Sequence, residues 1–266
     1  MLKPKRGKAV ETACRLHLAD NPGLKAGVRE NLMVINIKSS EEFERLLDAL
    51  GSELWNADFH IKLFRGLNSK IEKYERAYNQ SPTFWNFTFM AHRDAAIFRL
   101  MRIYDNHSAS LSLRNLLDTI KDNEQMFDIP QFRERLKGNP FVDSLASDAR
   151  KPDGVQLNKD MEFVSDADPL VKKLIIWRNN LYAHRSAKNV VKVYKIAADH
   201  PLAFAEIEGL VARAYEIFNR YKYLFDASSQ SSILLGLDDY EFVLTSLAAR
   251  LEQSDRESRA RRGMSD

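Results

Sequence analysis

The chain has 266 residues, enough for one large domain or two small ones, and its 44% hydrophobic and 29% charged residues are typical of a globular protein. A formal net charge of +3 does not by itself indicate a polyanionic partner. The single cysteine, Cys14, excludes an intramolecular disulfide and a zinc site made of clustered cysteines. The basic N-terminus precedes no apolar signal-peptide core, and no apolar run reaches the roughly 18 residues of a membrane span, so we expect a cytoplasmic protein without a membrane partner.

The first predicted helix begins near residue 40. Ser39 or Ser40 followed by Glu42 is typical of a capping box, and Gly51 is expected to stop or bend this helix. A longer helical pattern follows over about residues 53–78.

The middle of the chain predicts two further helices and then an irregular stretch. Ser81-Pro82 marks a helix start, with a strong apolar pattern up to Tyr104. Ser110 or Ser112 is expected to cap the next helix. Prolines and glycines then break residues 122–167 into short pieces.

The C-terminal part predicts three helices. Asp168-Pro169 opens one that runs through Leu181, and the others cover about residues 201–225 and 237–251. The charged tail after Glu252 is expected to be frayed or disordered.

Two short stretches rich in β-branched residues, 32–37 and 190–194, could be strands, and the sequence does not decide this. Everything else indicates an all-α protein, an antiparallel bundle of about six to eight helices with one irregular connection. We divide it into an N-terminal extension (1–39), a helical domain (40–225) and a C-terminal helix with a charged tail (226–266).

Several catalytic signatures are absent from the sequence. It has no glycine-rich phosphate loop, no His-Glu-x-x-His zinc helix and no Gly-x-Ser-x-Gly elbow. The six histidines show no metal-ligand spacing. We therefore expect no metal and no cofactor, which leaves acid–base chemistry without a metal.

The segment from Trp177 to Arg185 is the most informative one. In it Arg178 is followed directly by Asn179 and then by His184. The spacing alone is weak evidence, because Arg102 and His107 form a second match. The first match lies in a stretch without Asp or Glu, residues 171–198, whose basic residues are Lys172, Lys173, Arg178, Arg185, Lys188, Lys192 and Lys195. Such a local positive field attracts phosphates.

The chain resembles the AbiU-like branch of the HEPN superfamily, the helical ribonucleases of phage-defence and toxin–antitoxin loci. The resemblance covers about residues 56–225 and runs through Phe89-Met90-Ala91-His92-Arg93-Asp94, Arg102-Ile103-Tyr104-Asp105, Leu111-Ser112-Leu113 and Leu116-Leu117 to the Arg178 motif. It implies a homodimer that cuts RNA without a metal, and a toxin or phage-defence effector with RNA and a cognate antitoxin protein as partners.

By this resemblance the catalytic residues are Arg178, Asn179 and His184. Lys172, Lys173, Arg185, Lys188 and Lys192 are the expected RNA-binding residues. A histidine can move the proton of the 2′-hydroxyl, and an arginine can hold two phosphate oxygens. On an ideal α-helix, however, His184 would lie about 120° around the axis from Arg178. The site therefore requires that the helix ends near Tyr182, that it bends, or that a second subunit completes it.

Other interpretations of the same residues stay open. Arg178 could instead form a salt bridge with Asp166 or Asp168, and His184 could stabilise a helix C-terminus. Trp177, Leu181 and Tyr182 are more typical of a core or an interface than of a base-stacking surface. The chain would then be a catalytically silent module that binds RNA, a nucleotide or a partner protein, or a helical scaffold.

Overall fold

Ten α-helices make up most of the computed structural model, which describes residues 37–182, 191, 196 and 198–263. They are α1 (Ser40–Ser69), α2 (Glu75–Gln80), α3 (Pro82–Ile103), α4 (Leu113–Asp122), α5 (Ile129–Arg135), α6 (Val142–Leu145), α7 (Gly154–Phe163), α8 (Pro169–Trp177), α11 (Phe204–Asp226) and α12 (Tyr240–Arg261). Within this part of the chain there is no strand, and the predicted all-α class is confirmed. The two possible strands fall almost wholly outside the described residues.

Helix α1 begins where its cap predicts. The Ser39 hydroxyl accepts a hydrogen bond from the Glu42 amide (3.3 Å), and the Glu42 carboxylate accepts one from the Lys38 amide (2.7 Å). Side-chain oxygens thus satisfy amide groups that have no partner within the helix.

The prediction that Gly51 stops or bends this helix is wrong, because α1 continues through it to Ser69. Gly51 is buried, and a Cβ atom there would lie only 3.1 Å from Cζ of Phe218 on α11. The glycine therefore allows the close approach of another helix. A glycine inside a helix costs about 0.5–1 kcal/mol relative to alanine, and packing against Phe218 offsets that cost.

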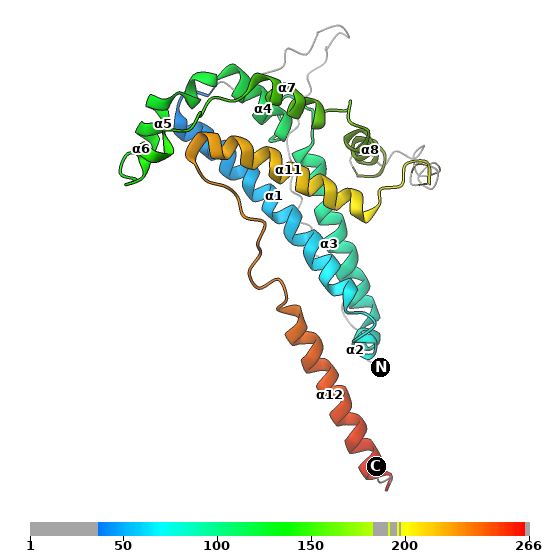
Figure 1. Ribbon diagram of the computed structural model, residues 1–266. Coiled ribbons are helices and arrows are strands. Elements are labelled where there is room, and N and C mark those ends of the chain that lie inside the picture. The colour runs from blue at the N-terminus through cyan, green and yellow to red at the C-terminus, as the bar shows by residue number, and fades with distance from the viewer. Residues whose placement is uncertain (1–36, 183–190, 192–195, 197, 264–266) are drawn as a thin grey trace, which may run out of the picture. The chain divides into compact units, whose positions relative to one another are not determined.

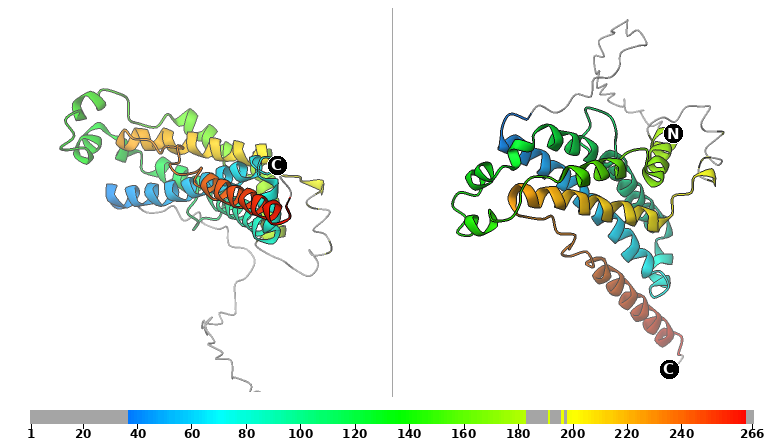
Figure 2. Two further views of the ribbon diagram at one scale, coloured as in Figure 1. Left: turned by 90° about the horizontal axis from the view of Figure 1, so that it is seen from below. Right: turned by 45° about the horizontal axis from the view of Figure 1, so that its top comes forward.

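Helices α1, α3 and α11 form the centre of the bundle. In Figures 1 and 2, α3 runs alongside α1 in the opposite direction, and α11 packs along the same pair. Their apolar faces meet in one core that includes Leu54, Leu100 and Phe218. Tyr104, at the end of α3, is fully buried and donates its hydroxyl hydrogen bond to the Leu210 carbonyl (2.7 Å). This bond fixes the end of α3 against α11.

The connection from residue 122 to 167 is broken into short pieces as predicted, and these pieces are a 3₁₀ helix (Glu124–Phe127) and the helices α5, α6 and α7. Arg150 joins α5 and α6 to α11, because its wholly buried guanidinium donates to the carbonyls of Leu145 and Tyr223. The same group stacks on the Phe132 ring at 4.4 Å. The two carbonyl oxygens accept its hydrogen bonds and the aromatic faces contact its charge, which lowers the cost of burying the guanidinium.

Helix α12 packs on the turn between α1 and α3. Its Leu244 is buried against Leu67, Tyr74 and Trp85, and ion pairs join α12 to Lys70 and Arg76. The prediction of a frayed tail after Glu252 is wrong, since α12 continues to Arg261 (Figure 1). Among the described helices, none has the length and apolar character needed to span a bilayer.

Candidate functional site

Helix α8 positions the motif. The Asp168 carboxylate caps its first turn by accepting from the amides of Leu170 (2.9 Å) and Val171 (3.0 Å), as the Asp-Pro pair predicts. At the other end, the indole of Trp177 donates to the His200 carbonyl (2.6 Å). The helix is thus fixed at both ends, immediately before Arg178.

The motif itself lies in a π-helical turn. The predicted α-helix through Leu181 ends instead at Trp177, and Arg178–Tyr182 form the π-helical turn. A π-helix has wider turns with i→i+5 hydrogen bonds, and such turns are frequent at functional sites. The rotation calculated for an ideal α-helix therefore does not apply between Arg178 and the residues that follow.

Arg178 forms an ion pair with Asp105, which follows the end of α3. The alternative pairing with Asp166 or Asp168 is wrong, because Asp168 caps α8 and pairs with Arg213 at 2.9 Å. The Nε of Arg178 also donates to the Asn179 side-chain oxygen at 3.1 Å. The guanidinium is thus held in one orientation while 28% of the side chain stays exposed.

Asp105 organises the loop after α3. Its carboxylate also accepts from the Ser110 hydroxyl (2.8 Å) and from the His107 amide (3.0 Å). Burial alone would raise the pKa of Asp105, but these two bonds and the charge of Arg178 together lower it below its ordinary value. Asp105 is therefore an anion that fixes Arg178.

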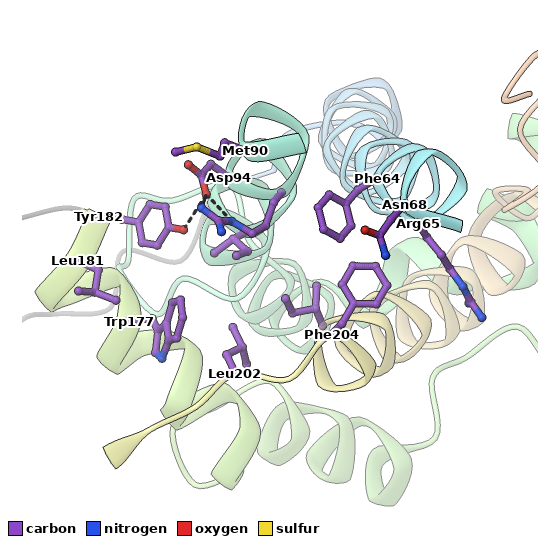
Figure 3. A pocket seen from close by; sticks show the side chains of 13 residues that line it. Phe64, Arg65, Asn68, Met90, Asp94, Trp177, Leu181, Tyr182, Leu202 and Phe204 are labelled. Atoms are coloured by element: carbon purple, nitrogen blue, oxygen red, sulfur yellow. Dashed lines mark hydrogen bonds and ion pairs between the residues drawn. The ribbon is translucent and has the colours of Figure 1, made fainter. Parts of the chain in front are cut away.

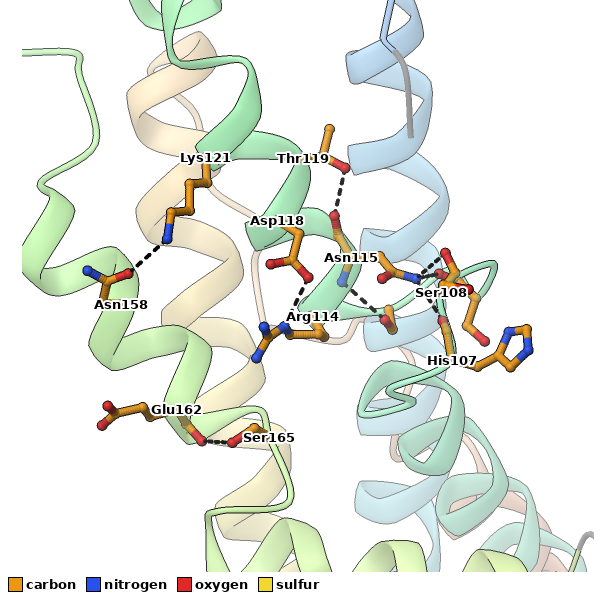
Figure 4. Close-up of polar contacts among 12 residues, drawn as sticks. His107, Ser108, Arg114, Asn115, Asp118, Thr119, Lys121, Asn158, Glu162 and Ser165 are labelled. Atoms are coloured by element: carbon orange, nitrogen blue, oxygen red, sulfur yellow. Dashed lines mark hydrogen bonds and ion pairs between the residues drawn. The ribbon is translucent and has the colours of Figure 1, made fainter. Parts of the chain in front are cut away.

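The second Arg–His match lies beside the first in space. Asp105 binds both Arg178 and the amide of His107, although the sequence separates the two matches. The amide of Asn115 on α4 holds this loop by donating to the carbonyls of His107 (2.9 Å) and Ser110 (2.6 Å). Figure 4 shows the exposed His107 ring pointing away from α4. Sequence reasoning missed Asp105 as the partner of Arg178, although it lies within the segment that resembles the family.

A cavity of about 790 Å³ opens beside the motif. Figure 3 shows it between Trp177, Leu181 and Tyr182 on one side and Phe64 and Asn68 of α1 on the other. Its walls are largely aromatic or aliphatic, and its polar lining groups are Arg65, Asn68, Arg93 and Asp94, besides the Tyr182 hydroxyl.

Tyr182 joins this cavity to α3. Its hydroxyl donates to the Asp94 carboxylate (3.3 Å), which also binds Arg93 (2.9 Å). Burial, followed by the charge of Asp94, raises the pKa of Tyr182 to about 12, so the phenol stays neutral. Trp177 and Tyr182 also pack against the main core, as their alternative interpretation predicts.

The family model for AbiU2, of the HEPN group, matches residues 40–245. This is the greater part of the chain, from α1 into α12. The chain belongs to the AbiU2 family of HEPN proteins. It is therefore an HEPN module of the abortive-infection type. No curated protein and no solved structure shows detectable similarity to it.

In this HEPN module the two predicted RNA-binding lysines on α8 differ in whether they form an ion pair. Lys172 on α8 is exposed, whereas Lys173 forms an ion pair with Glu206 of α11 (2.5 Å). His184 lies outside the described residues. The same is true of Arg185, Lys188 and Lys192. Asn179 is exposed next to Arg178 and accepts its Nε–H.

Two histidines of the HEPN module meet away from the motif. Nδ1 of His60 on α1 lies 2.9 Å from Nδ1 of His92 on α3. Burial lowers the pKa of both rings, and the charge of His92 adds to the effect on His60. The two rings form a part-buried polar contact between α1 and α3. In the part of the chain that the structure describes, no three His, Cys, Asp or Glu side chains gather as metal ligands would.

Proposed function

We propose that this HEPN module is a metal-independent endoribonuclease, a toxin or phage-defence effector that acts on RNA as a homodimer. The observation that carries the proposal is the position of Arg178, at the start of a π-helical turn, oriented by Asp105 and Asn179 in a chain of this family. We further propose that a cognate antitoxin protein restrains it.

In the proposed reaction RNA supplies its own nucleophile. His184 takes the proton of the 2′-hydroxyl or gives one to the leaving 5′-oxygen, as a histidine that titrates near neutral pH can. The 2′-oxygen forms a bond to phosphorus while the bond to the 5′-oxygen breaks. The products are a 2′,3′-cyclic phosphate and a 5′-hydroxyl.

Arg178 is the group that would stabilise the charge on the phosphate. Its bonds to Asp105 and Asn179 use Nη1 and Nε, whereas a guanidinium carries five N–H donors. Donors therefore remain for phosphate oxygens while Asp105 keeps the group oriented. A donor that is already oriented needs little reorganisation as charge develops in the transition state.

The basic surface would guide RNA to this position. Lys172 and Lys173 on α8 lie one to two turns before Arg178, and Arg185, Lys188 and Lys192 complete the proposed RNA-binding set. Phosphate contacts of this kind carry affinity without sequence preference.

The alternative is a catalytically silent module that binds RNA, a nucleotide or a partner protein. The cavity beside the motif favours it, because Trp177 and Phe64 provide apolar walls and Asn68 an amide, which suit a base. Stacking on an aromatic side chain contributes about 1–3 kcal/mol per base. Both candidates use the same phosphate contacts, but only the nuclease requires His184 to transfer a proton.

Identifying the ends of the RNA products tests the proposal. The purified full-length protein is incubated with RNA in excess EDTA, and the fragments are analysed for cyclic phosphate and 5′-hydroxyl ends. The proposal predicts cleavage with both kinds of end. Binding without cleavage would favour the silent module, and cleavage that requires added magnesium or manganese would place the chemistry elsewhere.

A further inference from the structure

The cavity beside the π-helical turn has fixed aromatic walls on opposite sides. Trp177 forms one wall, and its indole is held by the hydrogen bond to the His200 carbonyl (2.6 Å). Phe64 of α1 forms the other, and its ring packs against Phe204 and Phe89 at centroid separations of 5.4 and 6.0 Å. Figure 3 shows the space between the two walls. Because these rings are already fixed, they lose little conformational freedom when a planar group binds between them.

A carboxylate with unused acceptor capacity lines the same cavity. The described contacts of Asp94 all meet at its Oδ1 atom, which accepts from Nε (3.0 Å) and Nη2 (2.9 Å) of Arg93 and from the Tyr182 hydroxyl (3.3 Å). Its Oδ2 atom has no donor among the residues that the structure describes. An ionised carboxylate accepts about four hydrogen bonds. Asp94 is therefore oriented by its neighbours and still able to accept from N–H groups of a ligand.

Two arginines at the cavity keep donors for an anion. Arg65 and Arg93 are 69% and 48% exposed, and each pairs with one carboxylate, Glu208 at 2.7 Å and Asp94 at 2.9 Å. A guanidinium has five N–H donors, so both can also bind phosphate oxygens. Aromatic walls, an acceptor inside and cations at the edge together match a nucleotide, which combines a planar base with a phosphate.

The turn that forms one side of the cavity also carries the proposed phosphate-binding group. Arg178 directly follows Trp177, but it pairs with Asp105, beyond the end of α3, whereas Tyr182 contacts Asp94. Asp105 lies eleven positions after Asp94, which corresponds to about 16 Å along a helix. The base in the cavity therefore belongs to a nucleotide a short distance along the strand from the phosphate at Arg178.

We infer that this cavity binds a guanine base of the RNA, with the Asp94 carboxylate accepting from its N1–H and its N2 amine and with Trp177 and Phe64 against its faces. The inference rests on the proposed function in taking RNA as the ligand. Guanine presents two adjacent N–H donors on one edge, and a carboxylate only accepts. Uracil has a carbonyl oxygen on each side of its ring N–H, and these oxygens repel a carboxylate. Adenine and cytosine place a ring nitrogen with a lone pair beside their single amine.

RNA that cannot be cut separates binding from catalysis. Short oligouridines with 2′-O-methyl riboses have no free 2′-hydroxyl, so the parent protein binds them without cleavage. One central position holds guanosine, inosine or adenosine, and fluorescence anisotropy gives the affinity. Inosine differs from guanosine only in lacking the N2 amine. Since a hydrogen bond to a charged group is lost, guanosine should bind about tenfold more tightly than inosine. Adenosine should bind no better than inosine.

Replacing the carboxylate tests its assigned role. Asp94→Asn should lose most of the preference for guanosine over inosine, because the amide has no charge and only one acceptor atom. The matched control is Asp118→Asn. Asp118 likewise pairs with an arginine of its own helix, Arg114 at 2.9 Å, but it lines no part of the cavity, so this variant should keep the full preference.

A second pair of variants tests the aromatic wall and does not alter the contact of Asp94 with Tyr182. Phe64→Leu should weaken binding of the guanosine oligomer by at least about fivefold, because stacking is lost. Phe59→Leu is the matched control on the same helix. The Phe59 ring stacks on Trp55 outside the cavity, and its replacement should leave the affinity unchanged. Circular dichroism confirms that each variant keeps its helices.

Two results would overturn the inference directly: equal affinity of the parent for the guanosine and inosine oligomers, or a folded Asp94→Asn variant with the full preference. Competition with GMP distinguishes a free nucleotide from RNA. GMP lacks the neighbouring phosphates and should compete weakly, whereas displacement as tight as the binding of the guanosine oligomer would assign the cavity to a free nucleotide and overturn the inference.

Cleavage of unmodified RNA is measured separately. Preference for guanosine without any cleavage would contradict the proposed function and leave the guanine site standing. Cleavage by a protein that shows no such preference would do the reverse. If both proposals hold, the cleaved bonds lie at a fixed distance from a guanosine in the sequenced fragments.

Discussion

Replacing Asp105 with asparagine should destabilise the protein and release Arg178. The carboxylate is 20% exposed and binds Arg178, Ser110 and the amide of His107. A hydrogen bond to a charged group contributes about 1.5–3 kcal/mol, and an asparagine can keep only part of this set. Because Arg178 is partly hydrated, we expect a loss of about 2 kcal/mol in the free energy of unfolding. For a domain of this size that lowers Tm by about 4–8 °C.

The loss should depend on pH in a defined direction. Since the pKa of Asp105 is lowered in the folded state, its contribution is present above the ordinary aspartate pKa and is lost as the pH falls through the folded value. The asparagine that replaces it does not titrate. The difference between parent and Asp105→Asn should therefore be full at pH 7 and shrink in strongly acidic buffer.

A double-mutant cycle measured by urea unfolding checks this reasoning. Asp105→Asn and Arg178→Ala, alone and combined, should show a coupling of about 1 kcal/mol or more, because contacting residues are not additive. The matched control pairs Arg178→Ala with Asp168→Asn, whose carboxylate binds Arg213 instead, and should show additivity within about 0.5 kcal/mol. A coupling near zero for Asp105, or an equal one for Asp168, would refute the assigned ion pair.

Three further outcomes follow from the described contacts. The pKa values of His60 and His92 are lowered in the folded state, so protonation of either ring favours unfolding. The Tm measured by calorimetry should therefore fall as the pH drops below about 6.5. The His92→Gln variant should show a weaker dependence of Tm on pH. Lys172→Ala should reduce the slope of log affinity for single-stranded RNA against log salt concentration by about 0.7. Lys173→Ala should change that slope less, because the Lys173 amine already pairs with Glu206. Equal changes of slope for the two variants in fluorescence-anisotropy titrations would contradict this difference. Gly51→Ala should destabilise the protein despite alanine's higher helix propensity, because its methyl group meets Phe218; a higher Tm would contradict the close-approach explanation.

Local signals in the sequence predicted the helix starts well. Ser39, Ser112 and Asp168 each accept from an amide of the helix that they precede, which a few neighbouring residues suffice to determine. The resemblance to the family placed the motif at the end of α8. The helix starts depend on interactions between residues that are close in the sequence, and the position of the motif follows from a pattern shared within the family.

Tertiary contacts explain what the sequence did not predict. Gly51 resembles a helix stop, but its role is set by Phe218 from a distant helix. Arg178 has acidic residues nearby in sequence at Asp166 and Asp168, yet its partner is Asp105, which the fold brings from the end of α3. The π-helical turn likewise has no signature in residue periodicity. Each depends on which helices pack together, which single-sequence patterns do not specify.

The most direct test of the nuclease assignment is RNA cleavage by His184→Ala. General acid–base catalysis typically contributes about 10²–10⁴-fold, so the substitution should reduce the cleavage rate by at least that lower factor while RNA affinity stays close to that of the parent. Arg178→Ala should weaken both. His107→Ala, at the second match beside Asp105, is the matched control and should retain most of the cleavage rate. If His184→Ala cuts RNA as fast as the parent protein, the assignment of catalysis to this motif is wrong.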